Sequence, residues 1–191
     1  MNYLAHILLS GDEPEIKIGG LLGDFVKGPL RGQYPHRIEQ GIALHRAIDS
    51  WFDQQSQVIA ARARFEPPLR RFAGIIVDIC YDHLLAKNWQ QHHPQPLNRF
   101  SGDFYQLLRD HYHLLPQRAQ RFTDHAPGIG LLENYAHRHT VGLTLSRIEQ
   151  RFRRPVDLSA ASVQLEHQWP QLQREFDQLF PRARAFAEQH R

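Results

Sequence analysis

The chain has 191 residues, of which 41% are hydrophobic and 23% charged, proportions typical of globular proteins that exclude a disordered chain. Its net charge of +3 suits an anionic partner, and its single cysteine excludes an intrachain disulfide and favours a reducing compartment. No apolar run approaches the roughly eighteen residues of a membrane span and no secretion signal opens the sequence, so we expect a cytoplasmic protein without a membrane partner.

Apolar side chains recur at helical spacing through most of the chain, and period-2 runs rich in β-branched residues are missing. The sequence therefore predicts an all-α protein. In chain order, the predicted helices are Asn2–Ser10, Glu15–Val26, Pro35–Asp53, Pro68–Trp89, Leu97–Leu114, Gln117–His125, Ile129–His137, Val141–Arg151 and Ser159–Gln189. Trp169-Pro170 and Phe180-Pro181 are expected to kink or divide the last one. Without a repeat or a long linker, residues 1–191 are expected to form one domain, a single helical bundle.

Histidines and aspartates in the first 90 residues interrupt the apolar faces of these predicted helices. An ionised carboxylate that faces a core is costly unless it is paired or binds a metal. Several such groups on different helices therefore indicate one shared cation. The set consists of His6, Asp24, His45, Asp49, Asp78, Asp82 and His83.

Helical spacing supports part of this interpretation. Residues four apart lie on one face of a helix, so His45 with Asp49, and Asp78 with Asp82, could each present two groups to one site. His83 lies about 100° from Asp82 around the helix axis. Asp82 and His83 can therefore flank one site only if it lies at the edge of the helix. Otherwise one of them supports the ligands and does not bind the metal itself.

Mixed imidazole and carboxylate ligands suit Mn²⁺, Fe²⁺ or Zn²⁺, and we expect Mn²⁺ or a close substitute such as Mg²⁺. The lack of a cysteine cluster argues against a structural zinc site. An interpretation without metal stays open. In it, Asp49 pairs with Arg46 and Asp24 caps a turn. His6 and His45 are then hydrogen-bonded core histidines.

Four segments resemble the motifs of the acyl carrier protein phosphodiesterase family, in order along nearly the whole chain. They are NYLAH at 2–6, GDFVKG at 23–28, GIALHRAID at 41–49 and DICYDHLL at 78–85. The resemblance implies hydrolysis, with Mn²⁺ support, of the phosphodiester joining 4′-phosphopantetheine to a serine of holo-acyl carrier protein. It also implies a distant relation to the HD-type metal phosphohydrolases and an HD-phosphohydrolase-like bundle. The adjacent pair, however, occurs here in the reversed order Asp82-His83.

On this resemblance we expect a set of metal ligands and two catalytic residues. Arg46 would clamp the phosphate, and Asp49 would orient a ligand histidine or transfer a proton. A salt bridge between these two residues, without chemistry, is the alternative. The expected metal ligands are Asp24, His45, Asp78 and His83, with His6 and Asp82 as further ligands or supporting groups.

The implied partner is an acidic carrier protein, which exposed arginines could dock. The arginine groups to compare are Arg62 and Arg64, Arg70 and Arg71, Arg118 and Arg121, and Arg151, Arg153 and Arg154. A first rival is an HD-type nucleotide phosphohydrolase or phosphodiesterase, which the same ligands would serve. A second is a helical nucleic-acid-binding protein. The sequence lacks the interleaved basic and aromatic positions that such a protein needs, so no nucleic-acid partner is expected.

Overall fold

The helices of the computed structural model account for most of the residues it describes, which are 1–150, 152, 157, 158 and 160–191. Within these residues there is no β-strand, which confirms the predicted all-α class. No helix among them is both long and apolar enough to cross a bilayer. The α-helices are α1 (Tyr3–Leu9), α2 (Pro14–Leu22), α3 (His36–Asp53), α4 (Ser56–Ala63), α5 (Ala73–Lys87), α6 (Leu97–Asp110), α7 (Gln117–His125), α8 (Leu131–Asn134), α9 (His139–Glu149), α10 (Ala161–Glu166) and α11 (Trp169–His190).

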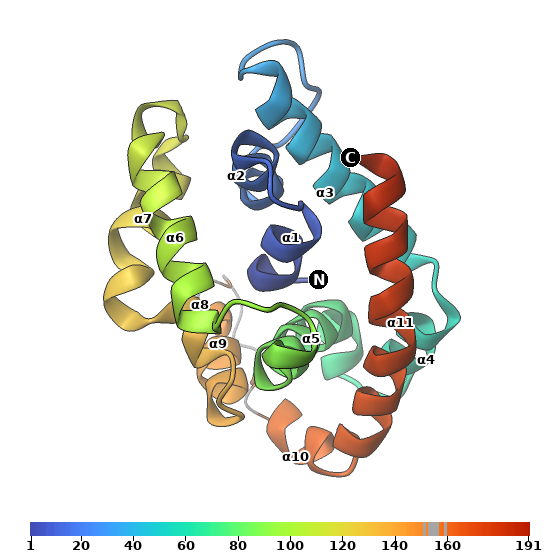
Figure 1. Cartoon of the computed structure of the whole chain (residues 1–191). Helices are drawn as coiled ribbons and strands as arrows, with labels where there is room; N and C mark the ends of the chain where they lie inside the picture. Colours follow the sequence, from blue (N-terminus) through green and yellow to red (C-terminus); the bar gives the residue numbers. More distant parts are fainter. Residues whose placement is uncertain (151, 153–156, 159) are drawn as a thin grey trace.

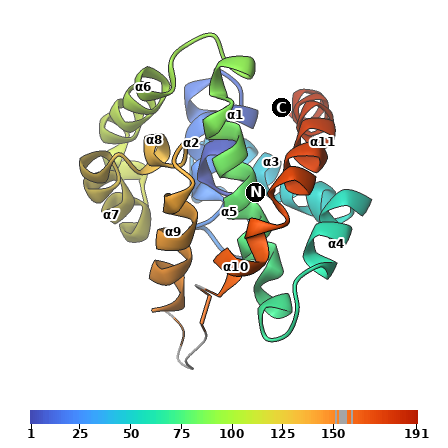
Figure 2. The ribbon, with the colours of Figure 1, turned by 90° about the horizontal axis from the view of Figure 1, so that it is seen from below.

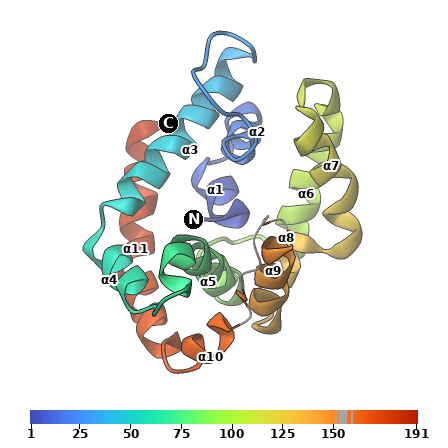
Figure 3. The same cartoon turned by 180° about the vertical axis from the view of Figure 1, so that it is seen from behind.

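The short helix α1 lies in the middle of the bundle. Figure 1 shows α2 and α3 above it, α5 below it, and α11 on the side opposite to α6 and α7, and Figure 3 shows the same arrangement from behind. The side chains from Leu4 to Leu9 are all buried. The imidazole of His6 therefore lies in the core of the molecule, where it needs polar partners.

Helices α2 and α3 pack backbone against backbone. A Cβ atom at Gly19 would lie 2.7 Å from the Cα of Gly41, and one at Gly41 would lie 2.9 Å from the Cα of Gly19. Real side chains do not tolerate such contacts, so the two helices approach this closely only because both positions are glycine. The close approach brings the end of α2 against the middle of α3, where His45 and Asp49 lie.

The predicted and observed helices differ in several places. Helix α4 was missed, because only Val58 and Ala61 in it are buried and so short an apolar face gives no clear periodicity. The predicted helix from Pro68 starts as a 3-10 turn before α5, and α2 ends at Leu22. Of the predicted helix Ile129–His137, only α8 is α-helical.

The last predicted helix is divided at one of its two prolines. Helix α11 begins at Trp169, next to Pro170, as expected, but it continues through Pro181. Pro181 is exposed, so water can hydrate the carbonyl that loses its helical partner. The predicted helix ends at Arg151 and Ser159, and the arginines at 153 and 154, lie outside the described residues. The likeness to HD-type enzymes and the single domain stay predictions.

Candidate metal centre

Three predicted residues meet where α1 crosses α3. His6 comes from α1, and His45 and Asp49 lie one turn apart on α3. The Nε2 atom of His6 lies 3.0 Å from Oδ1 of Asp49, and Nε2 of His45 lies 3.2 Å from Oδ2. The two imidazole rings stack with their centroids 3.7 Å apart. One ligand atom from each residue falls within 4.8 Å of the others, close enough to share one metal ion.

Helix α2 fixes the orientation of His45. Its Nδ1 lies 2.7 Å from the carbonyl oxygen of Gly20. A carbonyl can only accept, so Nδ1 carries the proton and Nε2 is left for Asp49 or a metal, as in many metal-binding histidines. A Cβ atom at Gly23 would lie 2.7 Å from the Cβ of His45 and closer still to its ring. The backbone of α2 thus forms the wall against which this imidazole is held.

His6 is a buried histidine whose ring lacks hydrogen bonds. Its side chain is fully enclosed, and neither ring nitrogen makes a hydrogen bond to a described residue, although Nε2 is within ion-pair distance of Asp49. Burial, and then the neighbouring His45, lower the pKa of His6 to about 3. A neutral imidazole with free nitrogen atoms in the core is costly, and a bound metal ion would satisfy it.

Further carboxylates surround these three residues. The α-amino group of Met1 lies 3.4 Å from Oδ1 of Asp49 and 3.3 Å from Oδ1 of Asp78. Burial favours loss of its proton, but the two carboxylates dominate and raise its pKa to about 10. Asp24, just after α2, has one buried oxygen without a hydrogen bond, and burial raises the pKa of its carboxyl. Three carboxylates and one ammonium group therefore lie around the two histidines.

Asp82 binds the backbone of α1. Its two carboxylate oxygens accept hydrogen bonds from the backbone N–H groups of Leu4 (2.8 Å) and Ala5 (3.2 Å). Burial raises the pKa of Asp82 to about 7, although these two hydrogen bonds favour the ionised form. The carboxylate takes the place of an N-cap side chain, because Asn2 makes no capping bond. Both oxygens are thereby engaged within the protein.

His83 lies away from the three clustered residues. Its Nδ1 donates to the backbone carbonyl of Tyr135 at 2.8 Å, and its ring meets Trp169 edge to face at 5.1 Å between centroids. The turn of about 100° between neighbours on a helix explains why it points elsewhere than Asp82. Asp82 and His83 therefore face different parts of the bundle and do not flank one site, which differs from both arrangements considered from the sequence.

The expected catalytic pair is not a salt bridge. The guanidinium of Arg46 donates from Nη2 to the carbonyl of Val26 at 3.0 Å. Among the described residues, the ion pairs of Asp49 are with Met1, His6 and His45 rather than with Arg46. The side chain of Asp49 is 44% exposed, whereas both histidines are buried, so solvent reaches the cluster from the Asp49 side.

The residues present fit a divalent metal ion. Two imidazoles and a carboxylate form a donor set that first-row transition metals accept, and the buried ring of His6, whose nitrogens make no hydrogen bond, has a donor that such an ion could bind. From the sequence, Asp49 was expected both in the group that shares one cation and as a catalytic residue, and the structure places it beside both histidines. Sequence analysis missed Gly20 and Gly23, although the run of glycines in α2 is a signal of close backbone approach.

Comparison with known proteins identifies the family of the chain. A family model described as acyl carrier protein phosphodiesterase matches residues 1–183. The curated protein "Acyl carrier protein phosphodiesterase" of Serratia proteamaculans is 35% identical over 182 residues, which are 95% of this chain and 94% of that protein. Its namesake in Klebsiella pneumoniae strain 342 is 32% identical over 192 residues, or 98% of both chains. No solved structure matches the chain. The chain therefore belongs to the acyl carrier protein phosphodiesterase family.

Proposed function

We propose that this protein hydrolyses the phosphodiester between 4′-phosphopantetheine and a serine of holo-acyl carrier protein, releasing apo-acyl carrier protein and 4′-phosphopantetheine. The family match over residues 1–183 carries this proposal, and the cluster of His6, His45 and Asp49 supplies a site for the reaction. The buried Cys80 is unsuited to act as a nucleophile, because burial raises the pKa of its thiol well above the usual range. Water is therefore the proposed nucleophile.

The proposed metal ligands are His6, His45 and Asp49, with Asp24 and Asp78 beside them. We expect Mn²⁺, with Mg²⁺, Fe²⁺ or Zn²⁺ as substitutes, because the donors are imidazoles and carboxylates. A divalent ion bound there would lower the pKa of a bound water and offset the charge of a phosphoryl oxygen.

The side chains around the metal have distinct parts in this proposal. His45 presents Nε2 because Gly20 holds its Nδ1 proton. Asp49, half exposed, faces the side from which a protein substrate can approach, and its carboxylate lies beside both histidines as the third ligand. Arg46 keeps guanidinium N–H groups beyond the one bound to Val26, and these can contact a phosphate. We assign Asp82 to holding α1, and we leave His83 out of the ligand set.

The partner and location follow the same proposal. The substrate is a carrier protein, so the enzyme would act in the cytoplasm. Arg118 and Arg121 on α7 are exposed and are free to dock an acidic partner. Arg62 and Arg64, in contrast, are engaged by Asp53 and Glu175, so they are less available for docking.

The test measures the intact mass of the carrier. Purified protein is incubated with holo-acyl carrier protein and Mn²⁺, with and without a chelator. We expect the carrier to lose the mass of phosphopantetheine only when metal is available. If its mass stays unchanged while calorimetry shows bound metal, the carrier is not the substrate, and nucleotides become the next substrates to assay.

Site variants separate the metal assignment from the substrate assignment. His45→Ala and Asp49→Asn should each lower both Mn²⁺ affinity and turnover by about 100-fold or more, since even groups that only support ligands cost 10–100-fold. His125→Ala is the matched control, because this histidine is exposed on α7 and bonds only its own helix. Turnover retained in Asp49→Asn would show that the metal lies elsewhere.

A further inference from the structure

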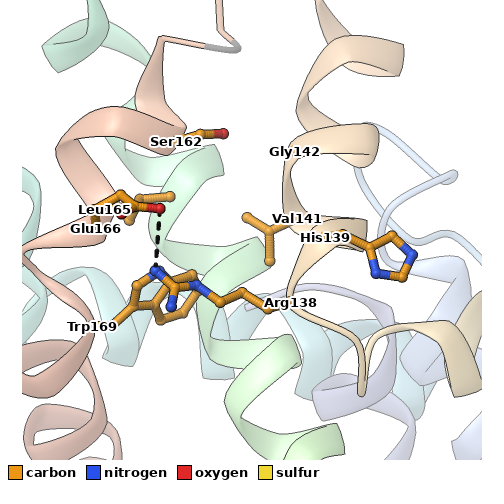
Figure 4. Close-up of a pocket in the computed structure, with 8 residues that line it drawn as sticks. All are labelled: Arg138, His139, Val141, Gly142, Ser162, Leu165, Glu166 and Trp169. Atoms are coloured by element: carbon orange, nitrogen blue, oxygen red, sulfur yellow. Dashed lines mark ion pairs between the residues drawn. The ribbon is translucent and has the colours of Figure 1, made fainter.

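A second polar site lies on another part of the bundle, beside α9, α10 and the start of α11. Two adjoining cavities of about 370 and 280 Å³ share Arg138 and Trp169 in their walls. Figure 4 shows Arg138 and Trp169 side by side between α9 and α10, and Figure 2 shows both helices next to α5. None of the three clustered metal-site residues lines either cavity. We call this place the Arg138 site.

The walls of the Arg138 site contain two cations, Arg138 and Lys87, and one carboxylate, that of Glu166. The guanidinium of Arg138 lies over the ring of Trp169, 5.0 Å from its centroid. Its closest carboxylate oxygen, on Glu166, is 3.8 Å away, which is too far for a hydrogen bond. Lys87 lines the smaller cavity and has no ion pair with a described carboxylate. Two cations and one distant carboxylate leave a net positive charge in these walls, which suits an anionic ligand.

His83 adds a directed polar group to the smaller cavity. It is 4% exposed, and its Nδ1 is committed to the carbonyl of Tyr135. The ring nitrogen that remains for a ligand is therefore Nε2, in the wall that also contains Lys87 and Arg138. Apolar side chains complete the walls, with Leu84 in the smaller cavity and Val141 and Leu165 in the larger one. A few polar groups on an apolar lining are typical of small-molecule sites.

We propose that the Arg138 site binds a small organic anion. Its carboxylate or phosphate group lies between Arg138 and Lys87, within reach of Nε2 of His83, and its apolar part lies against Val141 and Leu165. The guanidinium, which lies over the ring of Trp169, offers a pair of parallel donors that match two oxygens of one anionic group. The proposal is independent of the phosphodiesterase reaction, because it uses none of the residues assigned to the metal centre.

The test follows the indole N–H signal of Trp169 by NMR, assigned with a Trp169→Phe variant. Butyl phosphate, butyrate and inorganic phosphate are the probes, and butylammonium is the cationic control. We expect saturable shifts with butyl phosphate, butyrate or both, and the difference between these two identifies the head group. Binding at least tenfold weaker for inorganic phosphate is expected from the apolar walls. Equal binding of inorganic phosphate and butyl phosphate would contradict the proposal that the apolar part of the ligand packs against Val141 and Leu165.

Variants decide where the probe binds. Arg138→Gln should weaken binding at least tenfold, and Lys87→Gln should weaken it severalfold, with unchanged thermal unfolding because both side chains are on the surface. Arg182→Gln is the matched control, because this arginine also lies over a tryptophan, Trp51, but lines neither cavity. Unchanged binding in Arg138→Gln, or binding lost in His45→Ala instead, would overturn the proposal.

Discussion

The neutral state of His6 links the candidate metal centre to the stability of the protein. In the folded protein, burial and His45 lower its pKa from 6.5 to about 3, so it stays uncharged at neutral pH. Between these two pKa values the unfolded chain binds more protons than the folded one. The contribution of His6 to stability is therefore complete above about pH 6.5 and is lost as the pH falls towards 3.

We expect the metal-free protein to lose stability, by an amount on the order of a few kcal/mol, between about pH 7 and pH 4. Urea unfolding in the presence of a chelator at several pH values measures the change. The His6→Asn variant carries no titrating group at this position, so its stability should depend less steeply on pH. Identical pH slopes for the two proteins would show that the pKa of His6 is the same in the folded and the unfolded state.

At the scale of single elements, α1 is held by a carboxylate from another helix. Asp82→Ala removes the acceptor of two backbone N–H groups, those of Leu4 and Ala5. Buried donors left without partners cost about 1–3 kcal/mol, so we expect about 2 kcal/mol of lost stability by urea unfolding. Asp12→Ala is the control, since that carboxylate is fully exposed and its one ion pair, with Lys17, is as long as 4.0 Å. Equal losses would show that α1 needs no cap.

The contact between α2 and α3 gives a second test at this scale. In Gly23→Ala the new methyl group would collide with the ring of His45 and displace it from Asp49. We expect Mn²⁺ affinity, measured by calorimetry, to fall by about 10-fold or more. Gly102→Ala places a methyl group on α6 with no atom within 4 Å, and helix propensity makes it neutral or slightly stabilising. Wild-type Mn²⁺ affinity in Gly23→Ala would mean that the backbone at residue 23 can shift and leave His45 in place.

At the scale of the whole molecule, a buried ion pair joins the first half of the chain to its last helix. Arg64, at the end of α4, meets Glu175 of α11 with two N–O distances of 2.7 Å. Glu175 is only 5% exposed, so its charge depends on this partner and on Gln171. The pair holds α11 along the side of α3 and α4 that Figure 1 shows.

Arg64→Ala should therefore destabilise the protein by about 3 kcal/mol, because it leaves a buried carboxylate without its cation. Arg62→Ala breaks the exposed pair with Asp53 and should cost less than about 1 kcal/mol. Thermal and urea unfolding of both variants provide the comparison. A small effect of Arg64→Ala would show that water hydrates Glu175 when its partner is absent.

Helical periodicity alone predicted most of the bundle, including α3 to within one residue and α7 at both ends. The spacing of His45 and Asp49 also predicted that they would share a face, because an angle within one helix follows from residue number. Short elements such as α4 were missed, since burial of two side chains leaves little pattern. The sequence therefore predicted the regular helices best where one continuous face is apolar.

The sequence by itself determined the all-α class and the pairing of His45 with Asp49, because both follow from the fixed geometry of one helix. Only the tertiary structure decided that His6 completes the cluster and that Asp82 caps α1. Only it directed His83 towards the Arg138 site. These outcomes depend on which helix faces meet, and that is set by long-range packing, such as the glycine contact of α2 and α3, rather than by spacing along the chain.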